Sequence, residues 1–236
     1  GMVFLLVAGC SDGTSGAGGE ASLAPFPAPL AVPAKTVSAE DFVGAETCAA
    51  CHSEQYDAWS GSTHGTAGGD PGPSVVIAPF NGVPLRFRDG VVVPRRSADA
   101  YEFVVNQDGH EPIVLSVDGV IGGAHMIGGG TQGFVTKLAD GTVRFLAFDW
   151  SGTDQVWFCN TGSRLNDGWV PVTPELSLAD CGDWPAVRTV GTLDRFANCQ
   201  QCHGSQIETE LSVSLAAYET RYSTLQINCE SCHGPG

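Results

Sequence analysis

The chain has 236 residues, of which 42% are hydrophobic, and its 26 acidic and 11 basic side chains give a formal net charge of −15. This length can bury a real core in one or two domains, so the composition indicates a folded, acidic, soluble protein. The negative charge argues against nucleic acid as a partner, because nucleic-acid-binding surfaces are basic. It would steer basic redox partners towards the chain, although solubility alone explains it equally well.

The first ten residues, 1–10, predict a lipoprotein signal remnant. Residues 2–8 are seven consecutive apolar residues, and Val7-Ala8-Gly9-Cys10 resembles a bacterial lipobox, in which Cys10 would become the lipidated first residue. The basic stretch of a signal peptide is missing, so we expect that the true start has been lost; a cloning remnant before an ordinary strand is the alternative. No other segment has the about 18 consecutive apolar residues of a membrane span, so attachment would be by lipid alone.

Residues 11–40 are rich in Gly, Ala, Ser and Pro and contain almost no aromatic side chains. Such a composition predicts a flexible linker between the lipid anchor and the folded part, which we expect to begin near Phe42.

Residues 41–66 contain a Cys-x-x-Cys-His pattern that recurs twice further along the chain. The three copies supply Cys48, Cys51 and His52, then Cys199, Cys202 and His203, and finally Cys229, Cys232 and His233. Two thiols at this spacing can add to both vinyl groups of one haem while the adjacent His binds the iron, so the copies predict three covalently attached haem c groups.

Zinc ribbons and redox dithiols also use Cys-x-x-Cys. However, 26 residues separate Cys202 from Cys229, more than the about 15–20 of a zinc ribbon. Neither alternative requires a His after the second Cys in all three copies, which favours haem.

Residues 53–59 follow the first motif and predict a helix with Tyr56 and Trp59 on one face. We expect Gly61 to end this helix and His64 to lie on its exit. Twelve residues of helix would place His64 roughly 18 Å from His52, so it suits a neighbouring haem better than its own. A surface His in a turn is the alternative.

Residues 67–190 predict an antiparallel β-rich insert. Three pairs of β-branched and aromatic runs flank Asp-Gly dipeptides, which favour tight hairpin turns. The pairs are 86–88 with 91–93, 101–105 with 113–117, and 134–138 with 143–148. Cys159 and Cys181 are not used by any motif, and in an oxidising compartment they most simply form a disulfide; a free thiol or a ligand is the alternative.

Residues 191–236 carry the second and third motifs. Between the motifs, apolar residues recur at spacings of four, four, three and four, which predicts one apolar helical face that could cover a porphyrin edge or pack on the insert. These residues are Ile207, Leu211, Leu215, Tyr218 and Tyr222.

Three stretches resemble the cytochrome c-554-type family of multihaem cytochromes: 42–52, the residues Tyr56, Trp59 and Ser62-Thr63-His64, and 229–236. They are most similar to members that carry a β-rich insert between the first and second haem sites. In such proteins the His after the Trp is a haem ligand, a role that the resemblance assigns to His64. Another His usually follows the last motif, whereas this chain stops at Gly236, so we expect the front part of a longer cytochrome with at least three haems.

The remaining histidines decide whether every haem is closed by two protein ligands or one stays open to a small molecule. His125 lies in a Gly-rich run that permits close approach to a flat cofactor and is a candidate metal ligand beside Met126, although an ordinary loop fits as well. His110 follows a turn inside the insert, where we expect a solvated loop residue.

The sequence therefore predicts an α+β fold, in which the insert separates helical or irregular haem segments. The leading functional hypothesis is an electron-transfer cytochrome in the periplasm or at the surface of a bacterium, anchored to the membrane by lipid and serving redox protein partners. An oxidoreductase with one open haem, acting on a small nitrogen or sulfur compound, is the alternative. A third hypothesis makes the insert a binding module for a partner.

Overall fold

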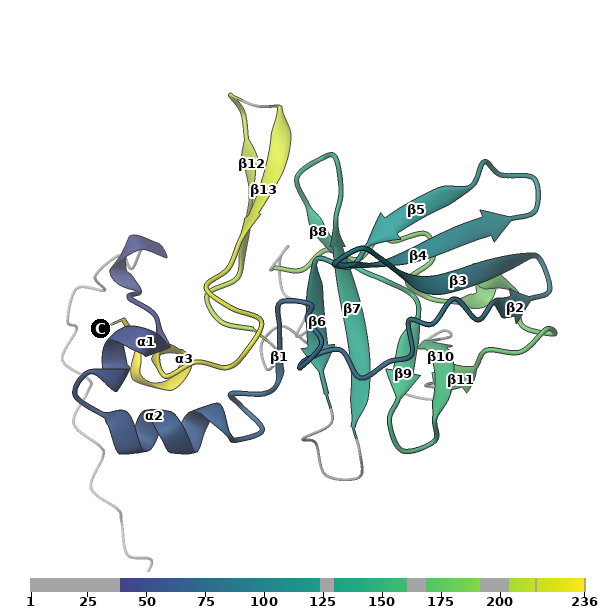
Figure 1. The fold of residues 1–236 in the computed structure, drawn as a ribbon. Helices are drawn as coiled ribbons and strands as arrows, with labels where there is room; N and C mark the ends of the chain where they lie inside the picture. Colours follow the sequence, from purple (N-terminus) through teal and green to yellow (C-terminus); the bar gives the residue numbers. More distant parts are fainter. Residues whose placement is uncertain (1–38, 124–129, 161–168, 192–203, 215, 236) are drawn as a thin grey trace, which may run out of the picture. The chain divides into compact units, whose positions relative to one another are not determined.

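A computed structural model describes residues 39–123, 130–160, 169–191, 204–214 and 216–235. The predicted signal remnant, almost all of the predicted linker, the second motif and His125 lie outside these residues. The described part is rich in antiparallel strands, with three short helices at the first and third motifs: α1 (Ala45–Ala49), α2 (Ser53–Ser60) and α3 (Glu230–His233) (Figure 1). A single-turn 3-10 helix, η1, spans Ala39–Asp41, and a second, η2, spans Leu178–Asp180.

A four-stranded meander is formed by β2 (Leu85–Phe87), β3 (Gly90–Ser97), β4 (Ala100–Gln107) and β5 (Ile113–Ser116). It confirms the first two predicted hairpins. Because Phe87 pairs with Gly90, the first turn is Arg88–Asp89, one residue earlier than the Asp-Gly dipeptide indicates. Period-2 alternation along β4 buries Tyr101, Phe103 and Val105 on one face.

A second, seven-stranded sheet has the order β1-β6-β7-β9-β10-β11, with β8 paired to β7. Its strands are β1 (Gly68–Gly69), β6 (Gly119–Gly122), β7 (Thr131–Lys137), β8 (Val143–Phe145), β9 (Asp149–Ser151), β10 (Val156–Asn160) and β11 (Trp169–Pro171). The β7–β8 pair confirms the third predicted hairpin, and Gly141 in its turn has the positive φ of 82° that this turn requires. The predicted antiparallel β-rich character is therefore confirmed.

The main core joins the two larger sheets through aromatic rings. Phe80 lies at its centre, with ring centroids 5.0 Å from Phe103 of the meander, 5.2 Å from Phe134 of β7 and 5.6 Å from Trp157 of β10. Edge-to-face packing of this kind adds to the gain from burial. The sheets thus form a packed unit that does not need the haem segments for its core.

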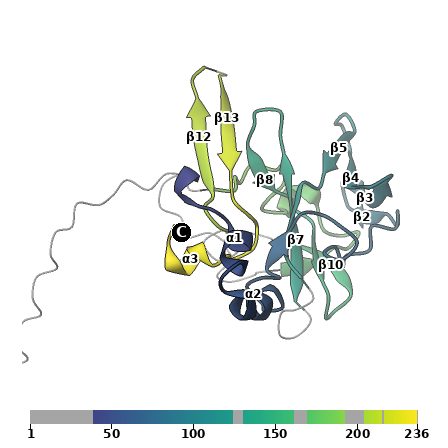
Figure 2. The ribbon, with the colours of Figure 1, turned by 60° about the vertical axis from the view of Figure 1, so that its left-hand side comes forward.

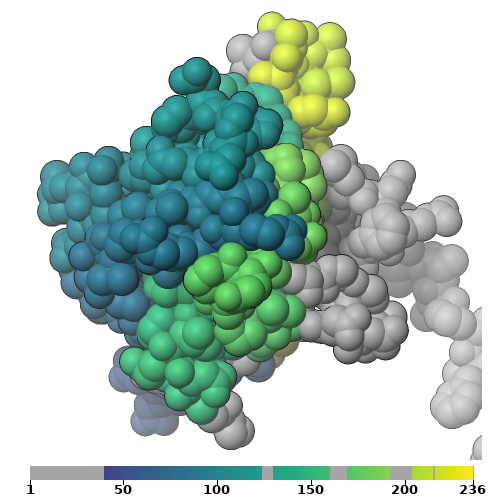
Figure 3. All heavy atoms as spheres, turned by 90° about the vertical axis from the view of Figure 1, so that its right-hand side faces the viewer, coloured from purple at the N-terminus to yellow at the C-terminus, as the bar shows by residue number. Residues whose placement is uncertain are grey.

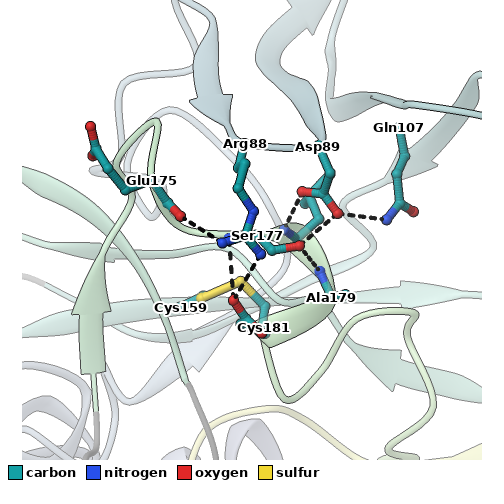
Figure 4. Close-up of polar contacts among 10 residues, drawn as sticks. Arg88, Asp89, Gln107, Cys159, Glu175, Ser177, Ala179 and Cys181 are labelled. Atoms are coloured by element: carbon teal, nitrogen blue, oxygen red, sulfur yellow. Dashed lines mark hydrogen bonds and ion pairs between the residues drawn. A yellow bond between two sulfur atoms is a disulfide. The ribbon is translucent and has the colours of Figure 1, made fainter.

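A loop segment, residues 172–190, packs against the first hairpin turn, where the Arg88 N–H donates to the Leu176 carbonyl at 2.8 Å. Figure 3 shows green spheres from this part of the chain beside the blue spheres of earlier residues. The Asp89 carboxylate accepts hydrogen bonds from the Ser177 hydroxyl and the Leu178 N–H, each at 2.7 Å, and from the Gln107 side chain at 3.2 Å (Figure 4). Burial opposes ionisation of Asp89, but these hydrogen bonds outweigh it and lower the pKa of the carboxyl group.

The same loop segment is fixed covalently by a disulfide between Cys159 of β10 and Cys181. Both residues are buried against the main core. The predicted pairing is therefore confirmed.

The predicted helical face over residues 207–222 is wrong. Two strands form there instead, β12 (Glu208–Ser212) and β13 (Ala217–Arg221), paired so that Leu211 lies opposite Tyr218. A spacing of four residues keeps side chains on one face of a strand as well as of a helix, so Ile207 with Leu211 and Tyr218 with Tyr222 satisfy both periods. Within the described residues, no helix is long and apolar enough to span a membrane.

Candidate haem site

The first and third motifs adopt the same backbone conformation. The Cys48 carbonyl accepts hydrogen bonds from the N–H groups of Cys51, at 3.2 Å, and of His52, at 2.9 Å. The Cys229 carbonyl accepts from the N–H groups three and four residues later, at 3.2 and 3.0 Å. Residues at these spacings share one side of a helical turn. The spacing in each motif therefore suits attachment of one haem through its vinyl groups and iron.

The two motifs lie side by side, although 181 positions separate Cys48 from Cys229. Figures 1 and 2 show α1 and α3 adjacent in both views. Glu230, only 4% exposed, lies inside the third motif, and its two carboxylate oxygens accept from the Val43 and Gly44 N–H groups, each at 2.9 Å. The Glu230 side chain of the third motif thus binds the N-terminus of α1, the helix that begins the first motif.

A second pair of contacts fixes the chain just before the third motif. The Trp59 indole N–H, from α2, donates to the Ile227 carbonyl at 2.7 Å. The Ile227 N–H donates to the His64 carbonyl at 3.2 Å. Ile227 precedes Cys229 by two residues. Trp59 in α2 and His64 after α2 therefore both help to position the third motif.

Asn228 organises the start of the third motif. Its side-chain oxygen accepts from the Ser231 N–H at 3.0 Å, which caps the short helix α3. Its backbone N–H donates to the Ser205 hydroxyl at 2.9 Å. Ser205 is buried and follows His203 by two residues, so the C-terminal flank of the second motif contacts the third motif directly.

A cavity of about 440 Å³ opens between the two described motifs. Its wall includes Cys48 and His52 from the first motif, Cys229 and His233 from the third, and Tyr56 from α2. The volume lies within the range of small-molecule and cofactor sites. Burial, together with the neighbouring Cys48 thiol, raises the pKa of the Cys229 thiol.

The donor set fits haem better than a bare metal ion. Both cysteines of each described motif are free thiols, and so can form thioethers. Among the residues that the structure describes, no three His, Cys, Asp or Glu side chains gather where they could hold a metal ion, so the two motifs do not combine into a zinc site. Haem iron needs only one imidazole from each motif.

Helix α2 also fits a haem-binding role. It confirms the predicted helix and ends at Ser60, before Gly61, yet none of its side chains is buried. Eight residues are too few for a helix to be stable without tertiary packing. The Tyr56 and Trp59 rings contact each other in a tilted arrangement, with centroids 5.4 Å apart, and Tyr56 reaches the cavity wall. An apolar macrocycle in this cavity would supply the missing packing surface.

The structure places His64 and His110 apart from this cavity. The chain turns after Ser60, so the twelve-residue helix assumed for the distance between His52 and His64 is not formed. The imidazole of His64 is exposed and does not line the cavity, while its carbonyl holds Ile227. His110 is exposed in the β4–β5 turn, as expected. The second motif and His125 lie outside the described residues.

Residues matched by a known family coincide with this site. The family described as cytochrome c554 and c-prime matches residues 47–70 and 185–234, which contain all three motifs and leave out the two larger sheets almost entirely. The chain is a multihaem c-type cytochrome. The cytochrome accordingly binds haem c covalently.

Other comparisons add two findings. No curated protein matches the cytochrome. A solved structure, the outer cell wall cytochrome OcwA, is similar over 83% of this chain, with 19% sequence identity and a TM-score of 0.44. The cytochrome spans 32% of the length of that chain.

Proposed function

We propose that this cytochrome transfers electrons between redox protein partners through at least three covalently bound haems. One observation carries the proposal: two haem motifs far apart in sequence adopt the same turn and line one cavity. Haems attached to both would lie close to each other, the arrangement that electron transfer between them needs. The flank of the second motif, at Ser205, bonds to the same region and supports a third haem nearby.

Each residue of the site has a distinct role. The paired thiols of the three motifs hold the haems as thioethers, and His52, His203 and His233 are the proximal iron ligands. When bound, the haem supplies the one-electron redox change, and the protein sets its potential through ligation and burial. Glu230, Trp59 and Asn228 position the motifs without contacting iron.

We propose His64 as the second iron ligand of a neighbouring haem. The hydrogen bond from Ile227 to its carbonyl fixes its backbone beside the third motif, while His64 is exposed and does not line the shared cavity. These observations favour a haem other than that of its own motif. His125 remains the second candidate for such a role.

The cysteine chemistry supports an extracytoplasmic location. The Cys159–Cys181 disulfide is typical of oxidising compartments such as the periplasm. A lipid at Cys10 would anchor the cytochrome to a bacterial membrane, facing the periplasm or the cell surface. The net charge of −15 favours basic protein partners over nucleic acid.

Spectroscopy of the haem-loaded protein tests this function. Intact mass spectrometry should show three haem increments, and electron paramagnetic resonance should show only low-spin iron. A high-spin haem that binds nitrite or hydroxylamine would contradict simple electron transfer and favour an oxidoreductase.

A variant pair tests the ligand assignment. His64→Ala should convert one haem from low spin to high spin, whereas His110→Ala, which changes an exposed loop imidazole, should leave every signal unchanged. An unchanged spectrum for His64→Ala would refute the ligand role.

A further inference from the structure

The hairpin β12–β13 lies between the second and third haem motifs in the sequence. Its foot is a bridge between Ser205, two residues after His203, and Thr224, five residues before Cys229. Five pairs then extend the hairpin from Glu208 opposite Arg221 to Ser212 opposite Ala217. We call residues 208–214 and 216–221 the hairpin arm. Both ends of the arm therefore start next to haem attachment sites.

The arm is anchored to the rest of the structure through its backbone and through Thr209. The Tyr218 N–H donates to the Asp140 carbonyl at 2.9 Å, and the Thr209 hydroxyl donates to the Val190 carbonyl at 2.7 Å. Gly141 and Gly191 approach the arm so closely that a Cβ on either would collide with it, at the Tyr218 carbonyl and at the Thr209 side chain respectively. A two-stranded hairpin is marginal alone, so these contacts hold the arm in one position.

One face of the arm carries apolar side chains that the described structure leaves partly or largely exposed. Leu211 and Tyr218, which face each other across the strands, are 57% and 41% exposed, and Val213 at the turn is 86% exposed. Strand periodicity puts Leu211 on the same face as Ile207, which packs on the second core cluster. The apolar face of the arm thus continues from Ile207, which is packed, to Leu211, which is exposed. Figure 2 shows the arm extending beyond the turn that joins β7 and β8.

The opposite face of the arm is acidic. Glu210 lies directly across from Glu219, an unfavourable pairing of like charges. Arg221 contacts both carboxylates, at 3.7 and 3.3 Å, and Glu208 adds a third negative charge. The arm therefore has an excess of two negative charges on a chain whose net charge is −15. Like charge opposes a second copy of this chain, whereas a basic protein would complement the arm.

We propose that the hairpin arm is the docking surface for a basic redox protein that carries its own apolar patch; this rests on the proposed electron-transfer function. Leu211, Val213 and Tyr218 supply the apolar contact, and Glu208, Glu210 and Glu219 attract the partner and orient it. The small apolar area suits the brief encounters typical of electron-transfer pairs. Docking here brings the partner to the segment that joins the second and third haem sites.

Stopped-flow kinetics on the haem-loaded full chain test the proposal. The reduced cytochrome is mixed with oxidised mitochondrial cytochrome c, a basic haem protein, and separately with ferricyanide, which needs no docking surface. Replacing the apolar side chains together, Leu211→Ser, Val213→Ser and Tyr218→Ser, should lower the rate constant with the basic protein about tenfold, because their contact contributes on the order of 1.4 kcal/mol. The ferricyanide rate should not change.

Matched variants separate docking from general surface effects. Val114→Ser, at a residue 56% exposed on β5, should change neither rate. Glu208→Gln with Glu210→Gln should slow the reaction with the basic protein and flatten its dependence on ionic strength. Val213 lies in an exposed turn. A lower rate constant for the single variant Val213→Ser would therefore not come from unfolding.

Each other outcome has a definite meaning. Equal rates with the basic protein for the parent and the triple variant would overturn the docking surface. So would a parent dimer that the triple variant cannot form, because the arm would then be a contact between copies. A parent that reduces ferricyanide but not the basic protein would also overturn it, whereas failure with both oxidants would refute electron transfer itself.

Discussion

Replacing Glu230 by Gln tests whether one buried carboxylate holds two haem sites together. The carboxylate accepts two backbone N–H groups at 2.9 Å and is 4% exposed. Gln keeps one acceptor oxygen but turns an NH₂ group towards the other N–H. The variant therefore loses one charge-assisted hydrogen bond and leaves an N–H without an acceptor, at a cost of about 2–3 kcal/mol.

Soret circular dichroism measures this loss, because it reports the relative placement of neighbouring haems. The thermal midpoint of the Soret signal should fall by about 5–10 °C, given roughly 2–4 °C per kcal/mol for a chain of this size. Glu46→Gln, an exposed carboxylate in the first turn of α1, is the matched control and should shift the midpoint little. Equal midpoints for the two variants would refute the role of Glu230.

Two further predictions concern the loop segment 172–190. The double variant Cys159→Ala and Cys181→Ala removes a disulfide of sequence separation 22. It should lose about 3 kcal/mol of unfolding free energy in the chain-entropy model. A thermal unfolding midpoint within 2 °C of the parent, measured by far-ultraviolet circular dichroism, corresponds to about 0.5–1 kcal/mol and would contradict this. Asp89→Asn should cost about 1–2 kcal/mol at pH 6. Because folding lowers the pKa of Asp89, its contribution is present above about pH 3.9 and disappears as pH falls through the folded-state value. The difference in unfolding free energy between parent and variant, measured by urea unfolding, should therefore shrink as the pH is lowered below about 3.9, and a difference independent of pH would argue against the carboxylate.

The parts of the fold that the sequence predicts correctly depend on local chemistry. Gly109 and Gly141 adopt positive φ in the turns that their Asp-Gly dipeptides indicate, and alternation on either side sets the strands. The helix α2 ends at Ser60, next to the Gly61 that the sequence indicates, although Gly61 keeps helical backbone angles, with φ −88° and ψ −2°. The Cys-x-x-Cys-His spacing is likewise local, which explains why the attachment sites can be identified without the fold.

The parts that the sequence does not predict depend on distant contacts. Nothing near Glu230 indicates that it binds the N–H groups of Val43 and Gly44, because residues between the two cysteines of such a motif vary in character. Asn228 carries a weak signal, since Asn is a common cap at the start of a helix. In residues 207–222 the spacing of apolar residues fits a helix and a strand alike, and the β-branched and aromatic side chains favour the strand.

The bond between Glu230 and Val43 joins residues 187 positions apart, which has a consequence for the order in which the protein assembles. As the chain is synthesised, the first motif emerges long before the side chain that completes its helix exists. Closing so large a loop directly is entropically unfavourable. Folding of the sheets shortens the path, since Gly68, in the first strand after the first motif, lies so close to the Leu225 carbonyl that a Cβ there would be 2.7 Å from it, and Leu225 precedes Cys229 by only four residues. We therefore expect haem attachment at the first motif to precede its final structure, and the sheets to act as the template on which the two haem sites meet.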